Sequence, residues 1–193
     1  MRRSQTATTF ITAVRVFIVI YLLFLGALAL LAQMILPSHF PILSVVGFGS
    51  ALVPLVVIYA SLELGDERAP ILAGILGLLL DLTSFHRLGI SVLILSSLSV
   101  LIMTQAQKPE SHHWLFRLTF VLVGTFAFLL LDYISILAET ARWYWPLDVW
   151  SKITFASLLN LALSPFFFYL AGLPPRLCGW KPAYELQERP YAR

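Results

Sequence analysis

Apolar segments of about 20 residues recur along the sequence, and they constrain the fold more than any other feature. A helix of that length crosses roughly 30 Å of hydrocarbon. Of the 193 residues, 59% are hydrophobic and 12% are charged, which is about half the charged fraction of a soluble domain. The strands of a membrane β-barrel would show alternating polarity, and the sequence has no such pattern. The sequence therefore predicts an all-α, polytopic membrane protein.

Six apolar segments can be drawn, and they predict a single transmembrane domain over residues 1–193. The predicted spans are about 14–36, 42–62, 69–83, 90–106, 115–137 and 150–172. This pattern favours a six-helix bundle whose third and fourth helices are short. The third segment would reach only about 22 Å as a helix. It therefore either crosses a thinned bilayer or folds back with the fourth segment as a re-entrant hairpin.

Lysine and arginine are distributed unevenly between the two sides of this topology. With the N-terminus inside, ten of the 13 basic residues face the cytoplasm, and three face outward: Arg87, Arg142 and Lys152. The positive-inside rule then predicts that both termini are cytoplasmic, with residues 174–193 as a cytoplasmic tail. The net charge of +3 comes from the basic ends, which suit anionic lipid headgroups better than nucleic acid.

The third apolar segment ends in a carboxylate, Asp81, which is costly in hydrocarbon unless it finds a partner. Gly74, Gly77 and Asp81 are spaced i, i+3 and i+7, so they share one helical face. Glycines on such a face allow another helix to approach closely. We predict that this face, together with Gly89 at the start of the next segment, packs against a neighbouring or partner helix. In the alternative, Asp81 only ends its helix and caps the following turn.

A second group of charges lies towards the outer side. Asp132 is near the outer end of the fifth segment, on the same side as Arg87, Arg142 and Lys152. An unpaired charge near hydrocarbon is expensive, so we predict at least one ion pair among these groups and Asp81. A structural pair is favoured over a proton relay, because the middle of the spans offers no chain of titratable groups.

The sixth segment carries a small polar face, made by Ser157, Asn160 and Ser164 at i, i+3 and i+7. Such side chains hydrogen-bond between membrane helices, and we predict that role here, with substrate lining as the alternative.

The outer loop before the sixth segment is rich in aromatic residues: Trp143, Tyr144, Trp145 and Trp150. These residues predict an aromatic belt at headgroup level. They could also form a contact surface for an external partner, because Trp and Tyr are favoured anchors.

Signals for chemistry are weak. His112 and His113 are adjacent and lie near Glu110, but they lack further metal-ligand spacing. The sequence contains no nucleophile–base pattern, phosphate loop or zinc helix motif. We therefore predict no metal, no cofactor and no enzymatic activity. The acidic stretch Leu62–Arg68 is expected to be a solvated loop.

The region from about residue 53 to 105 resembles the bacterial rod-shape-determining protein MreD family. A proline-bearing span (Val53-Pro54-Leu55 to Tyr59) leads to an acidic, glycine-containing turn. It is followed by Gly-Ile-Leu-Gly-Leu-Leu-Leu-Asp at residues 74–81 and by Leu88-Gly89-Ile90. The family pattern is a helix ending in Gly-x-x-Gly-Leu-Leu-x-Asp, and then a Leu-Gly that opens the next span. The tryptophan-rich loop and the tail from residue 174 are not part of that pattern.

The resemblance implies a non-enzymatic scaffold in the inner membrane of a bacterium, within the cell-elongation (rod) complex. Family members are thought to bind MreC, and through it to communicate with MreB and the peptidoglycan synthases that set cell shape. MreD-like chains are also distantly similar to the S components of energy-coupling factor transporters. The alternative function is therefore a small-molecule-binding subunit of such a transporter, which would need a pocket with several convergent polar groups.

Overall fold

The computed structural model describes residues 2–39, 52–84, 88–106, 114–140 and 146–177. Within these ranges the chain forms six α-helices and no strand, so the predicted all-α, six-helix fold is confirmed. The helices are α1 (Arg2–His39), α3 (Leu52–Leu64), α4 (Arg68–Ser84), α5 (Ile90–Ala106), α6 (Trp114–Thr140) and α7 (Leu147–Leu177). The helices α4 and α5, which correspond to the predicted third and fourth segments, have 17 residues each and are short as expected.

Helix α3 forms the centre of the bundle. It packs against α1, α4, α5, α6 and α7, and every residue from Val53 to Leu64 is buried. A helix that is apolar on all sides has no polar face to turn outward, so enclosure by its neighbours is the stable arrangement. Because α3 touches all five other helices, it fixes where they stand relative to one another.

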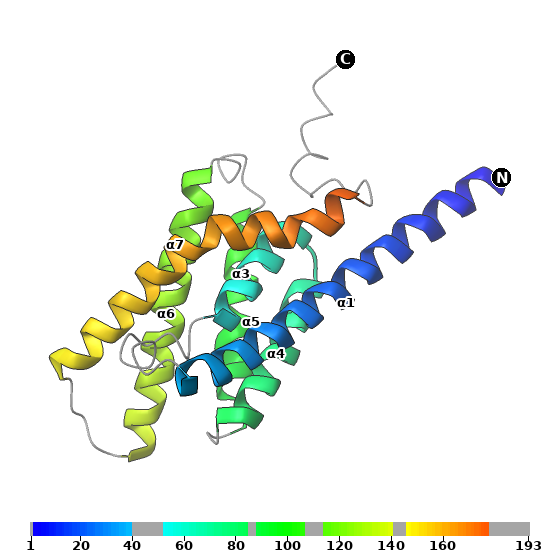
Figure 1. Ribbon diagram of the computed structural model, residues 1–193. Helices are drawn as coiled ribbons and strands as arrows, with labels where there is room; N and C mark the ends of the chain where they lie inside the picture. The colour runs from blue at the N-terminus through cyan, green and yellow to red at the C-terminus, as the bar shows by residue number, and fades with distance from the viewer. Residues whose placement is uncertain (1, 40–51, 85–87, 107–113, 141–145, 178–193) are drawn as a thin grey trace.

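Helices α1 and α7 cross the other helices obliquely, as Figure 1 shows. They contact each other, and the Tyr21 hydroxyl of α1 donates a hydrogen bond to the Leu170 carbonyl of α7 at 3.4 Å. The 38 residues of α1 correspond to roughly 57 Å, nearly twice the thickness of a bilayer's hydrocarbon. Its N-terminal end accordingly extends past the rest of the bundle (Figure 1).

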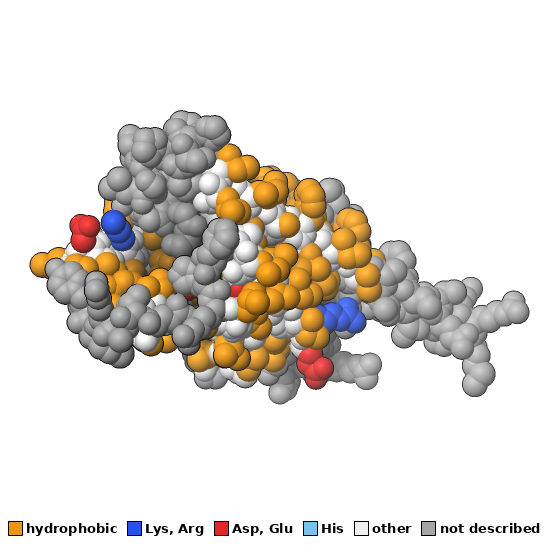
Figure 2. Space-filling model, turned by 90° about the horizontal axis from the view of Figure 1, so that it is seen from below, with side chains coloured by type: hydrophobic (Ala, Val, Ile, Leu, Met, Phe, Trp, Pro, Cys, Tyr) orange, Lys and Arg blue, Asp and Glu red, His pale blue; other side chains and the backbone are white. Residues whose placement is uncertain are grey.

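Among the described residues, three helices contain segments that are long and apolar enough to cross a membrane: Val16–Ile35, Trp114–Ala138 and Leu147–Leu173. Two shorter apolar helices cover Leu52–Leu64 and Ile90–Gln105. Large apolar side chains are exposed on the outward sides of the peripheral helices, and hydrophobic side chains cover much of the described surface on the face shown in Figure 2. So much exposed apolar surface is unfavourable in water and favourable in lipid. The chain is therefore a membrane protein.

The turn between α3 and α4 differs from the expected solvated loop. Leu62, Glu63 and Leu64 belong to α3 and are buried, so the expectation is wrong for these residues. Gly65 has a φ of 59°, the left-handed conformation that commonly ends a helix. Asp66 then caps α4, because its Oδ1 accepts a hydrogen bond from the Arg68 N–H at 3.1 Å. The connection outside the two helices is therefore only residues 65–67, of which Glu67 is exposed and Gly65 and Asp66 are half-buried.

Candidate functional site

Helices α4 and α5 form an antiparallel hairpin that brings together the residues singled out at the end of the third segment. These two helices share a more extensive contact than any other pair of helices in the described chain. Gly74, Gly77 and Asp81 lie along α4, and Gly89 precedes the first residue of α5. The hairpin is therefore the first place to examine for function.

The Asp81 carboxylate is buried and holds the start of α5. Only 2% of this residue is exposed. Its Oδ2 accepts a hydrogen bond from the Gly89 N–H at 2.6 Å, and its Oδ1 accepts one from the Ser91 N–H at 3.1 Å. The first N–H groups of a helix have no partner within the helix, and the helix dipole favours a negative charge there. Asp81 therefore caps the start of α5 from within the neighbouring helix, α4.

Gly89 supplies the backbone shape that this cap requires. Its φ is +104°, a conformation that L side chains rarely adopt, and a Cβ there would meet nothing within 4 Å. The Gly89 carbonyl already accepts the first helical hydrogen bond, from the Leu93 N–H at 3.0 Å. Glycine is thus needed at position 89 for its φ and not for lack of space.

The two glycines of α4 differ in how closely α5 approaches them. A Cβ at Gly77 would lie 2.7 Å from the Val92 Cα and 2.9 Å from the Ser91 carbonyl carbon, both backbone atoms. A Cβ at Gly74 would lie 3.3 Å from the Ser96 Oγ, which is a movable side-chain atom. Of these two glycines, Gly77 is consequently the one that the α5 backbone approaches more closely.

The polar and glycine residues of the hairpin hold α4 and α5 together and do not form a reactive site. Both carboxylate oxygens of Asp81 are engaged by backbone N–H groups, and Gly77 is buried against α5. A carboxylate held in this way is poorly placed to bind a solute or carry a proton. Among the described residues there is no group of three or more His, Cys, Asp or Glu side chains that could hold a metal ion.

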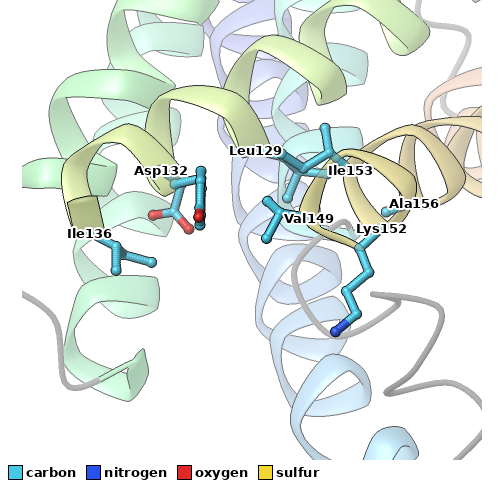
Figure 3. A pocket seen from close by; sticks show the side chains of 8 residues that line it. Leu129, Asp132, Ile136, Val149, Lys152, Ile153 and Ala156 are labelled. Carbon is cyan, nitrogen blue, oxygen red and sulfur yellow. The ribbon is translucent and has the colours of Figure 1, made fainter. Parts of the chain in front are cut away.

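Asp132 and Lys152 line a common pocket of about 240 Å³ between α6 and α7. Tyr133 is the third polar residue of its lining, and the rest is apolar: Leu129, Ile136, Val149, Ile153 and Ala156. Figure 3 shows Asp132 and Lys152 on opposite sides, with Leu129, Val149 and Ile153 between them. Two charges of opposite sign thus face one largely apolar space.

Lys152 forms an ion pair that the sequence did not suggest. Its Nζ lies 3.7 Å from the Oδ2 of Asp148, one turn earlier on α7. The Asp148 side chain is largely exposed and the Lys152 side chain about half exposed. Arg87 and Arg142, the other predicted cations, lie outside the described residues. A pair between either arginine and Asp132 stays a prediction.

The predicted polar face of α7 is buried, but its three residues have different partners. The Asn160 Nδ2 donates a hydrogen bond to the Thr125 Oγ1 of α6 at 3.2 Å. The Ser157 and Ser164 hydroxyls bond to carbonyls of their own helix, those of Ile153 and Leu161. The structure therefore gives Asn160 an interhelical role and shows two serines that satisfy themselves locally.

Sequence reasoning missed three buried hydroxyls: Thr125, Ser61 and Ser99. Thr125 receives the bond from Asn160, and the Ser61 and Ser99 Oγ atoms lie 2.7 Å apart between α3 and α5. Ser61 also donates to the Val57 carbonyl, so both hydroxyls are satisfied when Ser99 donates to Ser61. The available signal was the presence of several hydroxyl side chains in each of these apolar segments, among which these three do not stand out. That signal is common in membrane helices, where a hydroxyl can bond to its own helix.

The aromatic loop is described only at its end. Trp143, Tyr144 and Trp145 fall outside the described residues. Trp150 is 39% exposed and stacks on Phe126 of α6, with ring centroids 6.4 Å apart and planes at 30°. Its ring thus links α7 to α6, and a role in an aromatic belt or a partner surface stays a prediction.

One comparison with known proteins gives a result. The family model described as "rod shape-determining protein MreD" matches residues 12–172, which is most of the chain. No curated protein and no solved structure matches. The match includes all of α3, α4, α5 and α6, and hence the whole hairpin that Asp81 and Gly77 hold together.

Proposed function

Because the chain belongs to the family of the rod shape-determining protein MreD, we propose that it is a non-enzymatic membrane scaffold of the cell-elongation complex. The family's role in rod shape determination applies to most of the chain, since the match spans residues 12–172. The proposed location is the inner membrane of a bacterium, with both termini in the cytoplasm. The proposed direct partner is an MreC-like protein, and the indirect partners are MreB and the peptidoglycan synthases.

The use of buried polar groups supports a scaffold. Asp81 caps α5, Asn160 joins α7 to α6, and Ser61 joins α3 to α5. Each group stabilises the arrangement of helices, and none of these three contacts leaves a set of polar atoms converging on a solute. Rigid helix packing is what a protein needs in order to hold partners in a fixed geometry.

The exposed side of α4 offers a surface for the membrane span of a partner. It lies roughly a third of a turn around the helix from the glycine face. It consists of large apolar side chains that are 37–63% exposed: Ile71, Ile75, Leu78, Leu79 and Leu82. Apolar helix faces associate in lipid through close packing and not through charge. Contact between such faces would therefore resist salt.

Depletion of the protein in its native host tests the function directly. We expect cells to become round without acquiring a nutrient requirement, and expression of the Gly74→Ala variant to restore the rod shape. If depletion instead produced a requirement that excess of one vitamin or metal relieves, the chain would be a solute-binding subunit of a transporter.

Co-purification tests the partner. A single-span protein should be recovered with the chain in a fixed ratio, and the ratio should be unchanged in moderate salt. Photoreactive side chains placed singly at exposed positions of four helices (Phe24, Leu78, Val123 and Phe166) would identify the contacting helix. Loss of the partner in moderate salt would place the contact on charged loops instead of on the apolar helix faces.

Reporter fusions test the topology. Fusions after Leu36 and after Phe85 should report the outer side, and a fusion at Arg193 should report the cytoplasm. An external signal at Arg193 would exclude the arrangement with both termini inside.

A further inference from the structure

The pocket between α6 and α7 has features that the scaffold proposal does not use. It presents a carboxylate from Asp132 and a phenol from Tyr133 on α6, and an ammonium group from Lys152 on α7. The five remaining lining side chains are aliphatic. A space with opposite charges on opposite walls and an apolar surface between them (Figure 3) matches a zwitterion attached to an apolar body.

Both charges lie within the apolar parts of α6 and α7, near the ends of these parts that adjoin in the sequence. The apolar part of α6 ends at Ala138, six residues after Asp132, which is about 9 Å along the helix. The apolar part of α7 begins at Leu147, five residues before Lys152, or about 7.5 Å. Because α7 follows α6 in the chain, these two ends belong to the same side of the bundle. A lipid head group that enters the pocket from this side meets both groups, and the Lys152 side chain can extend outward to a phosphate while its methylenes stay in apolar surroundings.

We propose that this pocket binds the phosphoethanolamine head group of an aminophospholipid, with its ammonium at Asp132 and Tyr133 and its phosphate at Lys152. The ammonium has three N–H donors, and both the carboxylate and the phenol oxygen can accept them. The ion pair of Lys152 with Asp148 is solvent-accessible and contributes little to stability. Lys152 can therefore exchange the Asp148 carboxylate for a phosphate.

The size of the pocket favours a head group over a complete small molecule. About 240 Å³ is below the range of roughly 300–1,000 Å³ that is typical for sites enclosing a drug-sized ligand. A head group fills such a space, and the glycerol and first methylenes can lie against Leu129, Val149 and Ile153. The acyl chains then remain in the bilayer. This inference is independent of partner binding, so either proposal can fail without the other.

Lipid binding can be measured on the purified, full-length protein. The chain is delipidated and placed in nanodiscs of phosphatidylcholine that contain either phosphatidylethanolamine or phosphatidylglycerol, and retained lipids are counted by native mass spectrometry. Phosphatidylcholine is the matched control, because methylation keeps the charge of the head group and removes its N–H donors. A second arm offers water-soluble phosphoethanolamine to the protein in nanodiscs of phosphatidylcholine alone.

We expect phosphatidylethanolamine to be retained about tenfold better than either other lipid, the effect of one charge-assisted hydrogen bond. Asp132→Asn should abolish the preference over phosphatidylcholine, and Lys152→Gln should lower retention about tenfold. Asp148→Asn is the control: it removes an exposed carboxylate that does not line the pocket, and it should leave retention unchanged or raise it.

Three results would overturn the proposal. The first is equal retention of all three lipids, and the second is a preference that survives both Asp132→Asn and Lys152→Gln. The third is tight binding of soluble phosphoethanolamine without its lipid, which would make the pocket a solute site. Circular dichroism verifies that each variant is folded. If Asp132→Asn does not fold, Lys152→Gln decides the outcome, because the Lys152 side chain is about half exposed and dispensable for packing.

Discussion

Replacing Gly77 with alanine should destabilise the α4–α5 hairpin, whereas the same replacement at Gly74 should not. The added methyl group at position 77 would lie 2.7 Å from the Val92 Cα and 2.8 Å from the Val92 nitrogen. Neither backbone atom can rotate away. At position 74 the nearest atom is the Ser96 Oγ at 3.3 Å, and that side chain can turn aside.

The expected loss of stability at Gly77 follows from these distances. The closest contact must lengthen from 2.7 Å to about 3.4 Å, the start of ordinary van der Waals contact. Overpacking of this kind costs about 1–3 kcal/mol. A shift of about 0.7 Å would also stretch the 3.1 Å bond between Asp81 and the Ser91 N–H beyond useful range, at about 1–2 kcal/mol.

Alanine has a better helix propensity than glycine, which adds about 1 kcal/mol to the free energy of unfolding at either position. The net prediction for Gly77→Ala is a loss of about 1–4 kcal/mol in the free energy of unfolding. For Gly74→Ala it is a change between zero and about 1 kcal/mol of stabilisation.

Reversible unfolding in mixed micelles, followed by circular dichroism, measures both variants under the same conditions. Gly74→Ala is the matched control, because it makes the same chemical change one turn away on the same helix face. Equal stability of the two variants would refute the reasoning, since it would mean that α5 does not approach α4 at Gly77 as the structure describes.

Three further predictions concern polar contacts and can be checked by the same unfolding assay. Asp81→Ala should cost about 1–3 kcal/mol and Asp81→Asn about half as much, because an amide keeps one acceptor oxygen of two; equal losses would contradict the capping role. Gly89→Ala should cost about 1–2 kcal/mol through its φ of +104° alone, and a neutral result would argue against that turn. Asn160→Leu and Thr125→Val should show a coupling of about 0.6–2 kcal/mol in a double-mutant cycle, and additive losses would exclude their bond.

The sequence alone determined the class of fold. A chain with apolar segments of this length must satisfy its backbone polar groups inside the bilayer, and helices do so without help from neighbours. The six segments, the shortness of the third and fourth and the family resemblance all followed from local sequence. Gly77 and Asp81 could be singled out in the same way, because a glycine spacing and a carboxylate stand out against an apolar background.

The sequence could not decide which side chains meet. Lipid tails and the protein interior are equally apolar, so the composition of a segment does not distinguish its lipid-facing side from its buried side. Helix α3 illustrates this: its sequence reads as an ordinary span, yet it is enclosed by five helices. The burial of Glu63 was missed for a different reason: this residue lies in an acidic stretch with Asp66 and Glu67, and such a stretch is usually solvated.

Only the tertiary structure assigned partners to the polar residues. Asp81 needed the position of the α5 N-terminus, and Asn160 needed Thr125, which is 35 residues away in the sequence. The pocket that joins Asp132 to Lys152 likewise depends on how α6 and α7 are placed at their adjoining ends. These contacts depend on the separation and crossing of whole helices. Those quantities are set by the packing of all six helices together, and a local sequence pattern does not contain them.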